Sequence, residues 1–269
     1  MAVTLEFEKK PKALLSLIDS WIMIKRSSTH IVRNTDQLLG AFFQPIMFLV
    51  LFAAVFGGAV KESLPHGVNY LNFLMAGIIV QTVAFSSTTT ALAICNDLQK
   101  GIVDRFRSLP MTNFAVLNGH VISDLLRSTI STVVMLLTGL VIGFRSHADL
   151  VGWLTIAGIL LLFTFAFSWM MAIMGVFAKS VEAVQWLTFV IIFPLTFASS
   201  AFVPASSMPH YLRLFAENQP ITQVVEAIRA LMLDKPIGNY GWLAVAWCVG
   251  ILLVSVPFAS FLFRRKSAQ

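Results

Sequence analysis

Six long apolar runs, separated by polar segments, constrain this chain more than any other feature of its sequence. The hydrocarbon core of a bilayer is about 30 Å thick, so a helix that crosses it needs roughly 20 mostly apolar residues. Charged residues make up only 12% of the chain, too few to coat a soluble globule of this length. We therefore predict an all-α integral membrane protein with six transmembrane helices, at residues 38–60, 70–96, 121–144, 151–177, 184–202 and 242–263.

The segments that flank these runs divide the chain into three regions. Residues 1–37 are predicted to be a cytoplasmic N-terminal segment, residues 38–263 the transmembrane domain, and residues 264–269 a basic cytoplasmic tail. Apolar residues recur at helical spacing in the first region: Leu14, Leu17, Ile18, Trp21 and Ile24. This pattern predicts an amphipathic helix along the inner membrane surface, although a solvated helix packed on other protein would show it too. No secretory signal precedes it, so we expect an uncleaved N-terminus.

The placement of basic residues predicts the orientation in the membrane. An even number of spans puts both termini on one side, and that side holds thirteen of the nineteen Lys and Arg residues. The opposite side holds five, and Arg127 lies within a span. Lys and Arg gather on cytoplasmic loops, so we expect a multi-pass protein of the bacterial cell membrane with both termini in the cytoplasm. The same bias explains the net charge of +6, which leaves a nucleic-acid partner without support.

Several kinds of chemistry are missing from the sequence. It contains no G-x-x-x-x-G-K-[ST] phosphate loop, no G-x-S-x-G and no H-E-x-x-H, so the chain is not expected to hydrolyse ATP or a peptide by itself. The five histidines are predicted in loops or at span ends, and no metal site is expected. The two cysteines lie in different apolar runs and are expected to be free and buried. We predict that this chain is not an enzyme and binds no cofactor.

Few ionisable groups interrupt the apolar runs. The exceptions are Asp124 and Arg127, which are three residues apart on one helical face and are predicted one or two turns from the inner boundary. They are predicted to form an intramembrane ion pair, which either anchors the third span or takes part in gating. An ion-coupled carrier would be expected to keep more ionisable groups at mid-membrane.

Two sets of hydroxyl residues are candidates for the translocation path. In lipid such side chains hydrogen-bond within or between helices, so helix packing is the alternative role. The first set lies in the second span and the second set in the fifth: Ser86, Ser87, Thr88, Thr89 and Thr90, and then Thr196, Ser199 and Ser200.

Two stretches resemble a known family of membrane proteins. The polar insertion KGIVDRFRSLPM, at 100–111, resembles the membrane subunits of type-2 ABC exporters, specifically the daunorubicin-resistance permease family. The stretch FPLTFASSAFVPASSMPHYLRLFAENQPITQVVEAIRAL, at 193–231, resembles the fifth span and the external segment of that family. The resemblance extends over residues 21–266. One departure is Gln219, which separates Asn218 from Pro220 where the family commonly has Asn-Pro.

The resemblance implies partners and a coupling site. In such exporters two permease subunits pair, here expected to be identical, and two copies of a separate ATPase, which binds ATP and Mg, dock beneath them. The loop between the second and third spans would carry a short coupling helix, and the loop at 179–183 would also face the ATPase. The external segment would form two short re-entrant helices. The coupling residues implied are Gly101, Ile102, Val103, Asp104, Arg105, Phe106, Arg107, Leu109, Pro110 and Glu182.

The function expected from these observations is that of the permease subunit of an ATP-driven exporter for hydrophobic or amphipathic molecules, such as drugs or lipids. Three alternatives remain open from the sequence: an ion-coupled secondary carrier, an ABC permease that exports polysaccharides or glycolipids, and a purely structural subunit. A solvated basic loop is the alternative for the coupling segment, since cytoplasmic loops are basic in any case.

Overall fold

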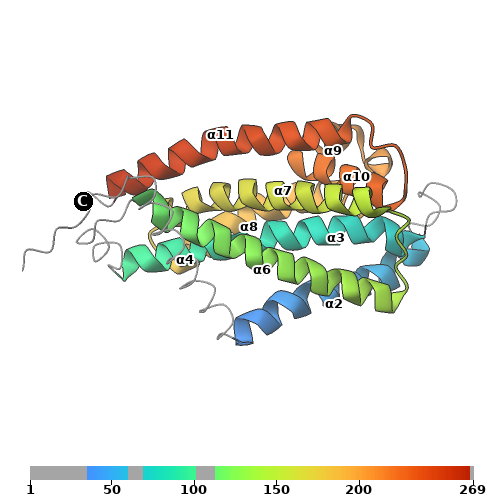
Figure 1. The fold of residues 1–269 in the computed structure, drawn as a ribbon, viewed down its shortest axis with the longest axis horizontal. Helices are drawn as coiled ribbons and strands as arrows, with labels where there is room; N and C mark the ends of the chain where they lie inside the picture. The colour runs from blue at the N-terminus through green and yellow to red at the C-terminus, as the bar shows by residue number, and fades with distance from the viewer. Residues whose placement is uncertain (1–34, 60–68, 101–112, 267–269) are drawn as a thin grey trace, which may run out of the picture.

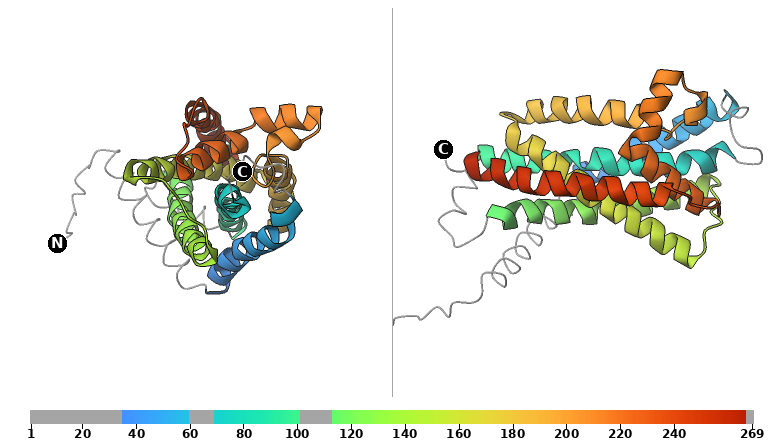
Figure 2. Two further views of the ribbon diagram at one scale, coloured as in Figure 1. Left: turned by 90° about the vertical axis from the view of Figure 1, so that its right-hand side faces the viewer. Right: turned by 90° about the horizontal axis from the view of Figure 1, so that it is seen from above.

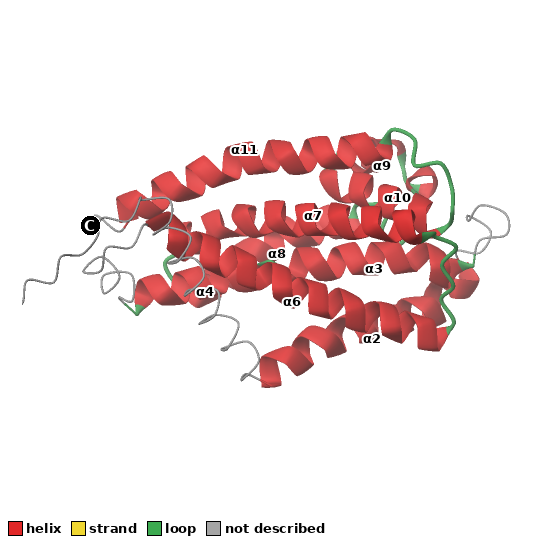
Figure 3. Cartoon of the chain, viewed as in Figure 1, coloured by secondary structure: helices red, strands yellow, loops and turns green. Residues whose placement is uncertain are grey.

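The computed structural model describes residues 35–59, 69–100 and 113–266, and within them every regular element is a helix (Figures 1 and 3). The predicted all-α class is therefore confirmed. The predicted N-terminal amphipathic helix and the coupling helix at 101–109 lie outside the described residues. The helices, in chain order, are α2 (Thr35–Ala59), α3 (Tyr70–Ser86), α4 (Thr88–Gln99), α6 (Asn113–Ile142), α7 (Leu150–Phe177), α8 (Val181–Phe197), η2 (Ala205–Ser207), α9 (His210–Asn218), α10 (Pro220–Met232) and α11 (Tyr240–Lys266).

Four helical stretches of the described residues are long and apolar enough to cross a membrane: Tyr70–Gln99, which comprises α3 and α4, Val116–Ile142, Leu150–Phe177 and Tyr240–Lys266. Two shorter apolar stretches, Pro45–Val55 of α2 and Val181–Phe197, accompany them. The chain is thus an integral membrane protein by length and composition of its helices, and the count of six spans stays a prediction.

The long helices run side by side with α3 at the centre (Figure 2). One end of the bundle, which we call the C-terminal end, carries the end of α11 (Figure 1). The opposite end, which we call the distal end, carries α9 and α10 and the starts of α3, α7 and α11 (Figures 1 and 2). Most of α3 is buried, as expected for a helix that is apolar all round. Gly77 permits one close approach, because a Cβ there would lie 2.0 Å from the carbonyl oxygen of Ala201.

The structure corrects the boundaries of two predicted spans. The second is two helices, with a break at Ser87, rather than one. Hydroxyls near this break bond to main-chain carbonyls, Ser87 Oγ to Val83 O at 3.1 Å and Thr89 Oγ1 to Ser86 O at 2.7 Å. The fifth ends at Phe197 rather than at 202, because the turn that follows is bonded to Thr222 and Arg229 of α10.

The third and sixth spans extend beyond their apolar runs. Helix α6 begins at Asn113, before the predicted start at 121, and α11 continues through Arg264, Arg265 and Lys266 of the predicted basic tail. A helix satisfies its own main-chain hydrogen bonds, so it can extend beyond the apolar run into polar residues. Cys95 and Cys248 are both free and buried, as predicted.

Candidate functional site

Five polar side chains meet inside the bundle beside the break between α3 and α4, and we call them the core polar cluster: Ser86, Asp124, Arg127, Ser128 and Ser168. The Asp124 carboxylate is fully buried; its Oδ1 contacts Arg127 Nη2, and its Oδ2 accepts a hydrogen bond from Ser168 Oγ at 2.5 Å. Ser86 Oγ lies 3.4 Å from Asp124 Oδ1 and accepts from Ser128 Oγ at 3.1 Å. These partners neutralise a charge that would otherwise be costly to bury.

The cluster joins three helices, because Ser86 comes from α3, Ser168 from α7 and the other members from α6. The sequence predicts Asp124 and Arg127 within one or two turns of the inner boundary. Asp124 lies about three turns from the start of α6 at Asn113, and the depth of the pair in the membrane stays a prediction. Sequence reasoning missed Ser168. A lone serine in an apolar run is the signal that could have found it, since polar groups in spans usually face the bundle interior.

A second polar pair lies one helical turn closer to the C-terminal end of the bundle. His120 Nε2 is 3.0 Å from Asp97 Oδ2, so α6 and α4 are linked here as well. His120 lies two turns inside α6, directly before the predicted span, so its place at a span end stays a prediction. The polar inner end of α6 continues its helix past the apolar run, and His120 lies within that extension.

The candidate path hydroxyls of α3 and α4 lie around the helix break. Ser87 and Thr90 are buried, while Ser86, Thr88 and Thr89 are partly exposed. Among the described residues Thr90 Oγ1 has no hydrogen-bond partner. Only the partly exposed members can border open space in this subunit, so a role in lining a path stays a prediction.

The candidate path hydroxyls near the end of α8 are fully buried within the subunit. Thr196 Oγ1 donates to Ile192 O at 2.6 Å, and Ser199 Oγ donates to Thr196 O at 2.5 Å. Ser199 and Ser200 belong to the turn after α8, not to the span as predicted. Their contacts are those of groups that shape a turn, and their part in a path also stays a prediction.

Arg229 of α10 links three elements at the distal end of the bundle through its guanidinium group. Its guanidinium is buried, and Nε donates to Phe73 O at 3.1 Å while Nη2 donates to Ser200 O at 2.7 Å. Nη1 pairs with Glu226 Oε1 at 2.5 Å, and the guanidinium carbon lies 3.6 Å from the centre of the Phe73 ring. Burial lowers the pKa of Arg229, and the charge of Glu226 opposes that change. The residue therefore links α10, α3 and the turn after α8.

Gln219, the residue that departs from the family pattern, has a structural role. Its backbone is extended between α9 and α10. Its Nε2 donates to Leu195 O at 2.8 Å and to Ala198 O at 3.0 Å. These carbonyls belong to the last turn of α8, where a helix leaves acceptors without internal donors. The inserted residue thus ties the α9–α10 junction to the end of α8.

The predicted coupling residues at 101–110 lie outside the described residues, but their surroundings are described. Gln99 Nε2, at the end of α4, donates to Lys179 O at 2.9 Å. Lys266 Nζ donates to Val176 O at 2.6 Å and to Ala178 O at 2.8 Å. Glu182 lies in the first turn of α8, which Ser180 caps by accepting from Ala183 N at 3.1 Å. The α7–α8 loop is therefore joined to the ends of α4 and α11.

These features define a class of protein: a helical, multi-pass membrane protein with paired polar groups in its core and a short-helix cap at one end. The described residues hold no cluster of side chains suited to a metal ion. Residues 19–233 match the family model described as ABC-2 type transporter. The chain belongs to this family. In the family the permease is a transmembrane subunit and the ATPase a separate one, so this chain is the membrane permease subunit of an ABC exporter and has no enzymatic activity of its own.

Named relatives cover most of the chain. It is 32% identical over 235 residues to the daunorubicin resistance ABC transporter permease protein DrrB1 of Streptomyces coeruleorubidus, covering 87% of this chain and 81% of the relative. It is 24% identical over 257 residues to the probable doxorubicin resistance permease DrrC of Mycobacterium tuberculosis, covering 96% and 92%. It is 26% identical over 214 residues to the putative transport permease ycf38 of Cyanophora paradoxa, covering 78% and 73%.

Proposed function

We propose that this chain is the conduit through which an ABC exporter moves hydrophobic or amphipathic molecules, drugs among them, out of a bacterial cell. The observation that carries the proposal is the match to the permease named for daunorubicin resistance over 87% of the chain. The core polar cluster agrees with an ATP-driven conduit, because Asp124 is held by Arg127 and Ser168 and is not free to carry an ion. ATP depletion with the ion gradients held should therefore stop export of a fluorescent drug from cells or vesicles.

The topology that we propose has six spans with both termini in the cytoplasm. Helices α2 and α8 would complete the six, and α9 and α10 would form the external re-entrant pair. The basic residues support this orientation: Lys100, Lys179, Arg264, Arg265 and Lys266 lie at the C-terminal end of the bundle, and none is buried. At the distal end Arg213 and Arg229 are each paired with a glutamate.

Thiol labelling tests this topology. In a background that lacks Cys95 and Cys248, cysteines introduced at His147 and His210 should react with an impermeant reagent in intact cells. A cysteine at Lys179 should react only after lysis. Protection of the first two positions together with labelling of the third would contradict the proposed orientation.

The partners that we propose are a second, identical permease and two copies of a separate ATPase that dock at the C-terminal end of the bundle. The segment with the coupling residues, 101–110, leaves α4 at Gln99 and returns at Asn113 of α6. Helix α6 carries Asp124 of the core polar cluster, and α4 carries Asp97, which pairs with His120 of α6. A displacement of the coupling segment would therefore be transmitted to the bundle interior. Glu182 and the α7–α8 loop, which is bonded to Gln99 through Lys179, would contribute to the same docking surface.

Co-purification of the ATPase tests the docking site. Replacing Phe106 by Ala removes the central apolar anchor of the segment and should weaken docking by about 2 kcal/mol, roughly 30-fold. Arg105→Glu should weaken it by charge repulsion. Phe258→Ala is the matched control, because Phe258 is an exposed aromatic residue of α11 outside the proposed docking surface. Equal recovery and equal ATP hydrolysis in Phe106→Ala and wild type would refute the assignment.

A further inference from the structure

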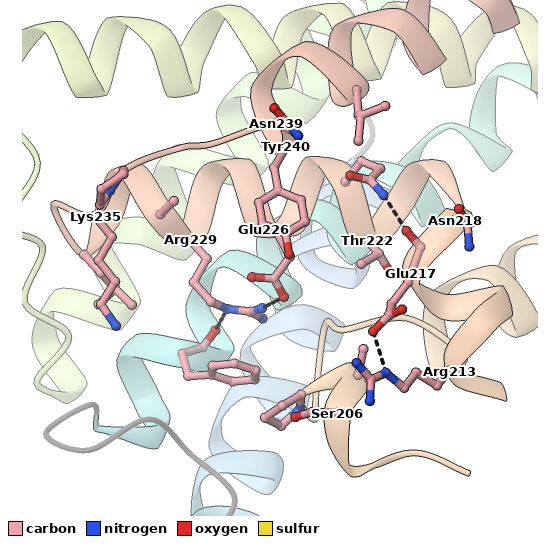
Figure 4. A pocket seen from close by; sticks show the side chains of 18 residues that line it. Ser206, Arg213, Glu217, Asn218, Thr222, Glu226, Arg229, Lys235, Asn239 and Tyr240 are labelled. Atoms are coloured by element: carbon pink, nitrogen blue, oxygen red, sulfur yellow. Dashed lines mark hydrogen bonds and ion pairs between the residues drawn. The ribbon is translucent and has the colours of Figure 1, made fainter. Parts of the chain in front are cut away.

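A pocket of about 850 Å³ opens at the distal end, between α9, α10 and the start of α11 (Figure 4). This volume is in the range of sites that hold drug-sized molecules. Its apolar lining includes Phe73, Pro204, Leu233 and Leu243, and its polar lining includes Glu226, Gln223 and Tyr240. We propose that this pocket binds the ammonium group of an amphipathic organic cation, with Glu226 as the counter-ion. The proposal rests on the proposed export function for the origin of the ligand.

Each of the three guanidinium nitrogens of Arg229, which lines the pocket, already donates to a group of the protein. Nε donates to Phe73 O, Nη1 to Glu226 and Nη2 to Ser200 O. The guanidinium group also lies over the ring of Phe73. The side chain of Arg229 is only 5% exposed, whereas that of Glu226 is 25% exposed. The Arg229–Glu226 pair therefore presents its carboxylate to the pocket rather than its guanidinium.

The unmatched groups of the pocket are hydrogen-bond acceptors. Within the described residues, Glu226 Oε1 accepts a hydrogen bond from Arg229 Nη1, and no donor is paired with Oε2. Gln223 is 4% exposed, and its Oε1 is buried without a partner among the same residues. A flip of the amide would not help, because Gln223 Nε2 already donates to Glu217 O at 2.5 Å. Of these two acceptors the Glu226 carboxylate is the one that a ligand in the pocket can reach, and a ligand that brings N–H donors and a positive charge fits it.

An anionic ligand fits the pocket less well. Lys235 and Arg213 line it from opposite sides, with Glu226 between them, so that they do not converge on one anion (Figure 4). Arg213 is moreover paired with Glu217 at 2.6 Å. The hydroxyl end of the Tyr240 side chain points toward Glu226, so a ligand at this carboxylate would also lie beside Tyr240 (Figure 4).

Two fluorescent probes that share the dansyl group and the alkyl chain but differ in charge test the proposal. Dansylcadaverine carries a primary ammonium, and its N-acetyl derivative is neutral. We expect the purified chain, in nanodiscs of zwitterionic lipid, to bind the ammonium probe about tenfold more tightly than the acetylated one, after subtraction of empty nanodiscs. Equal affinities for the two probes would overturn the proposal. The measurement needs neither ATP nor the ATPase, so its failure is distinguishable from failure of the export function, which drug export under ATP depletion tests.

Three variants locate the site. Glu226→Gln should reduce binding of the ammonium probe about tenfold and leave the acetylated probe within about twofold. Asp234→Asn is the matched control: it removes a carboxylate at the same end, from a position with φ of 51° that asparagine tolerates and that does not line the pocket. Ala230→Trp should fill the pocket and abolish binding without touching the Arg229–Glu226 pair. An equal effect of Glu226→Gln and Asp234→Asn, or normal binding by Ala230→Trp, would overturn the assignment even if Glu226→Gln folds poorly.

Discussion

Replacing Arg127 by Met gives a direct test of the core polar cluster. The variant leaves the fully buried Asp124 carboxylate without its counter-ion, and it also removes the Nε contact with Ser86 at 3.4 Å. Breaking a buried ion pair from one side costs about 3–5 kcal/mol. We expect the lower part of this range, about 3 kcal/mol, because Ser168 and Ser86 still donate to the carboxylate. For a chain of this size that loss corresponds to a fall in Tm of roughly 10 °C.

The two native cysteines supply the assay. Cys95 and Cys248 are free and buried, so a dye that fluoresces on reaction with thiols reports unfolding of the detergent-solubilised chain during heating. Arg213→Met is the matched control, because it breaks the exposed pair with Glu217 and should cost no more than about 1 kcal/mol. Combining Arg127→Met with Asp124→Asn removes both charges and should restore most of the stability.

Two results would refute this reasoning. The first is an Arg127→Met chain that unfolds at the temperature of the Arg213→Met control. The second is a double variant that is no more stable than Arg127→Met alone, because the cost would then come from lost packing of the arginine side chain rather than from an unpaired charge.

Three further predictions concern the distal end and the helix break. Gly77→Ala should lower stability by about 2 kcal/mol or more, because its Cβ would lie 2.0 Å from Ala201 O, whereas Gly158→Ala, with no atom within 4 Å of its Cβ, should be neutral or slightly stabilising in the same thermal assay. Arg229→Lys keeps the charge but cannot reach Phe73 O, Glu226 and Ser200 O together, so limited proteolysis between α8 and α10 should accelerate, which the exposed control Arg213→Lys should not cause. Thr88→Val and Thr89→Val should change which drugs are exported more than they change protein abundance, and parallel loss of export and abundance would favour helix packing.

Local features of the sequence were sufficient for most of the helices. An apolar run of membrane length specifies a helix without help from distant residues, since every main-chain group must be satisfied within the segment. The pairing of Asp124 with Arg127 is local in the same sense, because a spacing of three residues puts both on one face of α6.

Features that depend on distant contacts could not be read from the sequence. Helix α8 stops at Phe197 because Ser200, in the turn after it, is bonded to Arg229, 29 residues further along the chain. Ser168 could be recognised as polar but not assigned to Asp124, since 44 residues separate them. The distal pocket combines α3, the 204–206 turn, α9, α10 and α11, and no single stretch of sequence contains its shape.

The contacts also connect the two ends of the bundle. At the C-terminal end, α4 is bonded to the α7–α8 loop through Gln99 and Lys179. At the distal end, Arg229 fastens α10 to Phe73 of α3. Between these ends the α3–α4 segment is interrupted once, at Ser87, beside the core polar cluster. A docked ATPase that displaces α4 would move α3, and with it the pocket, if the two helices moved as one rigid unit. If the segment bent at Ser87 instead, less of the displacement would reach the pocket. Since Ser86 is held by Asp124, Arg127 and Ser128, the cluster stiffens this junction, and we expect variants that loosen it to uncouple ATP hydrolysis from export before they prevent ATPase docking.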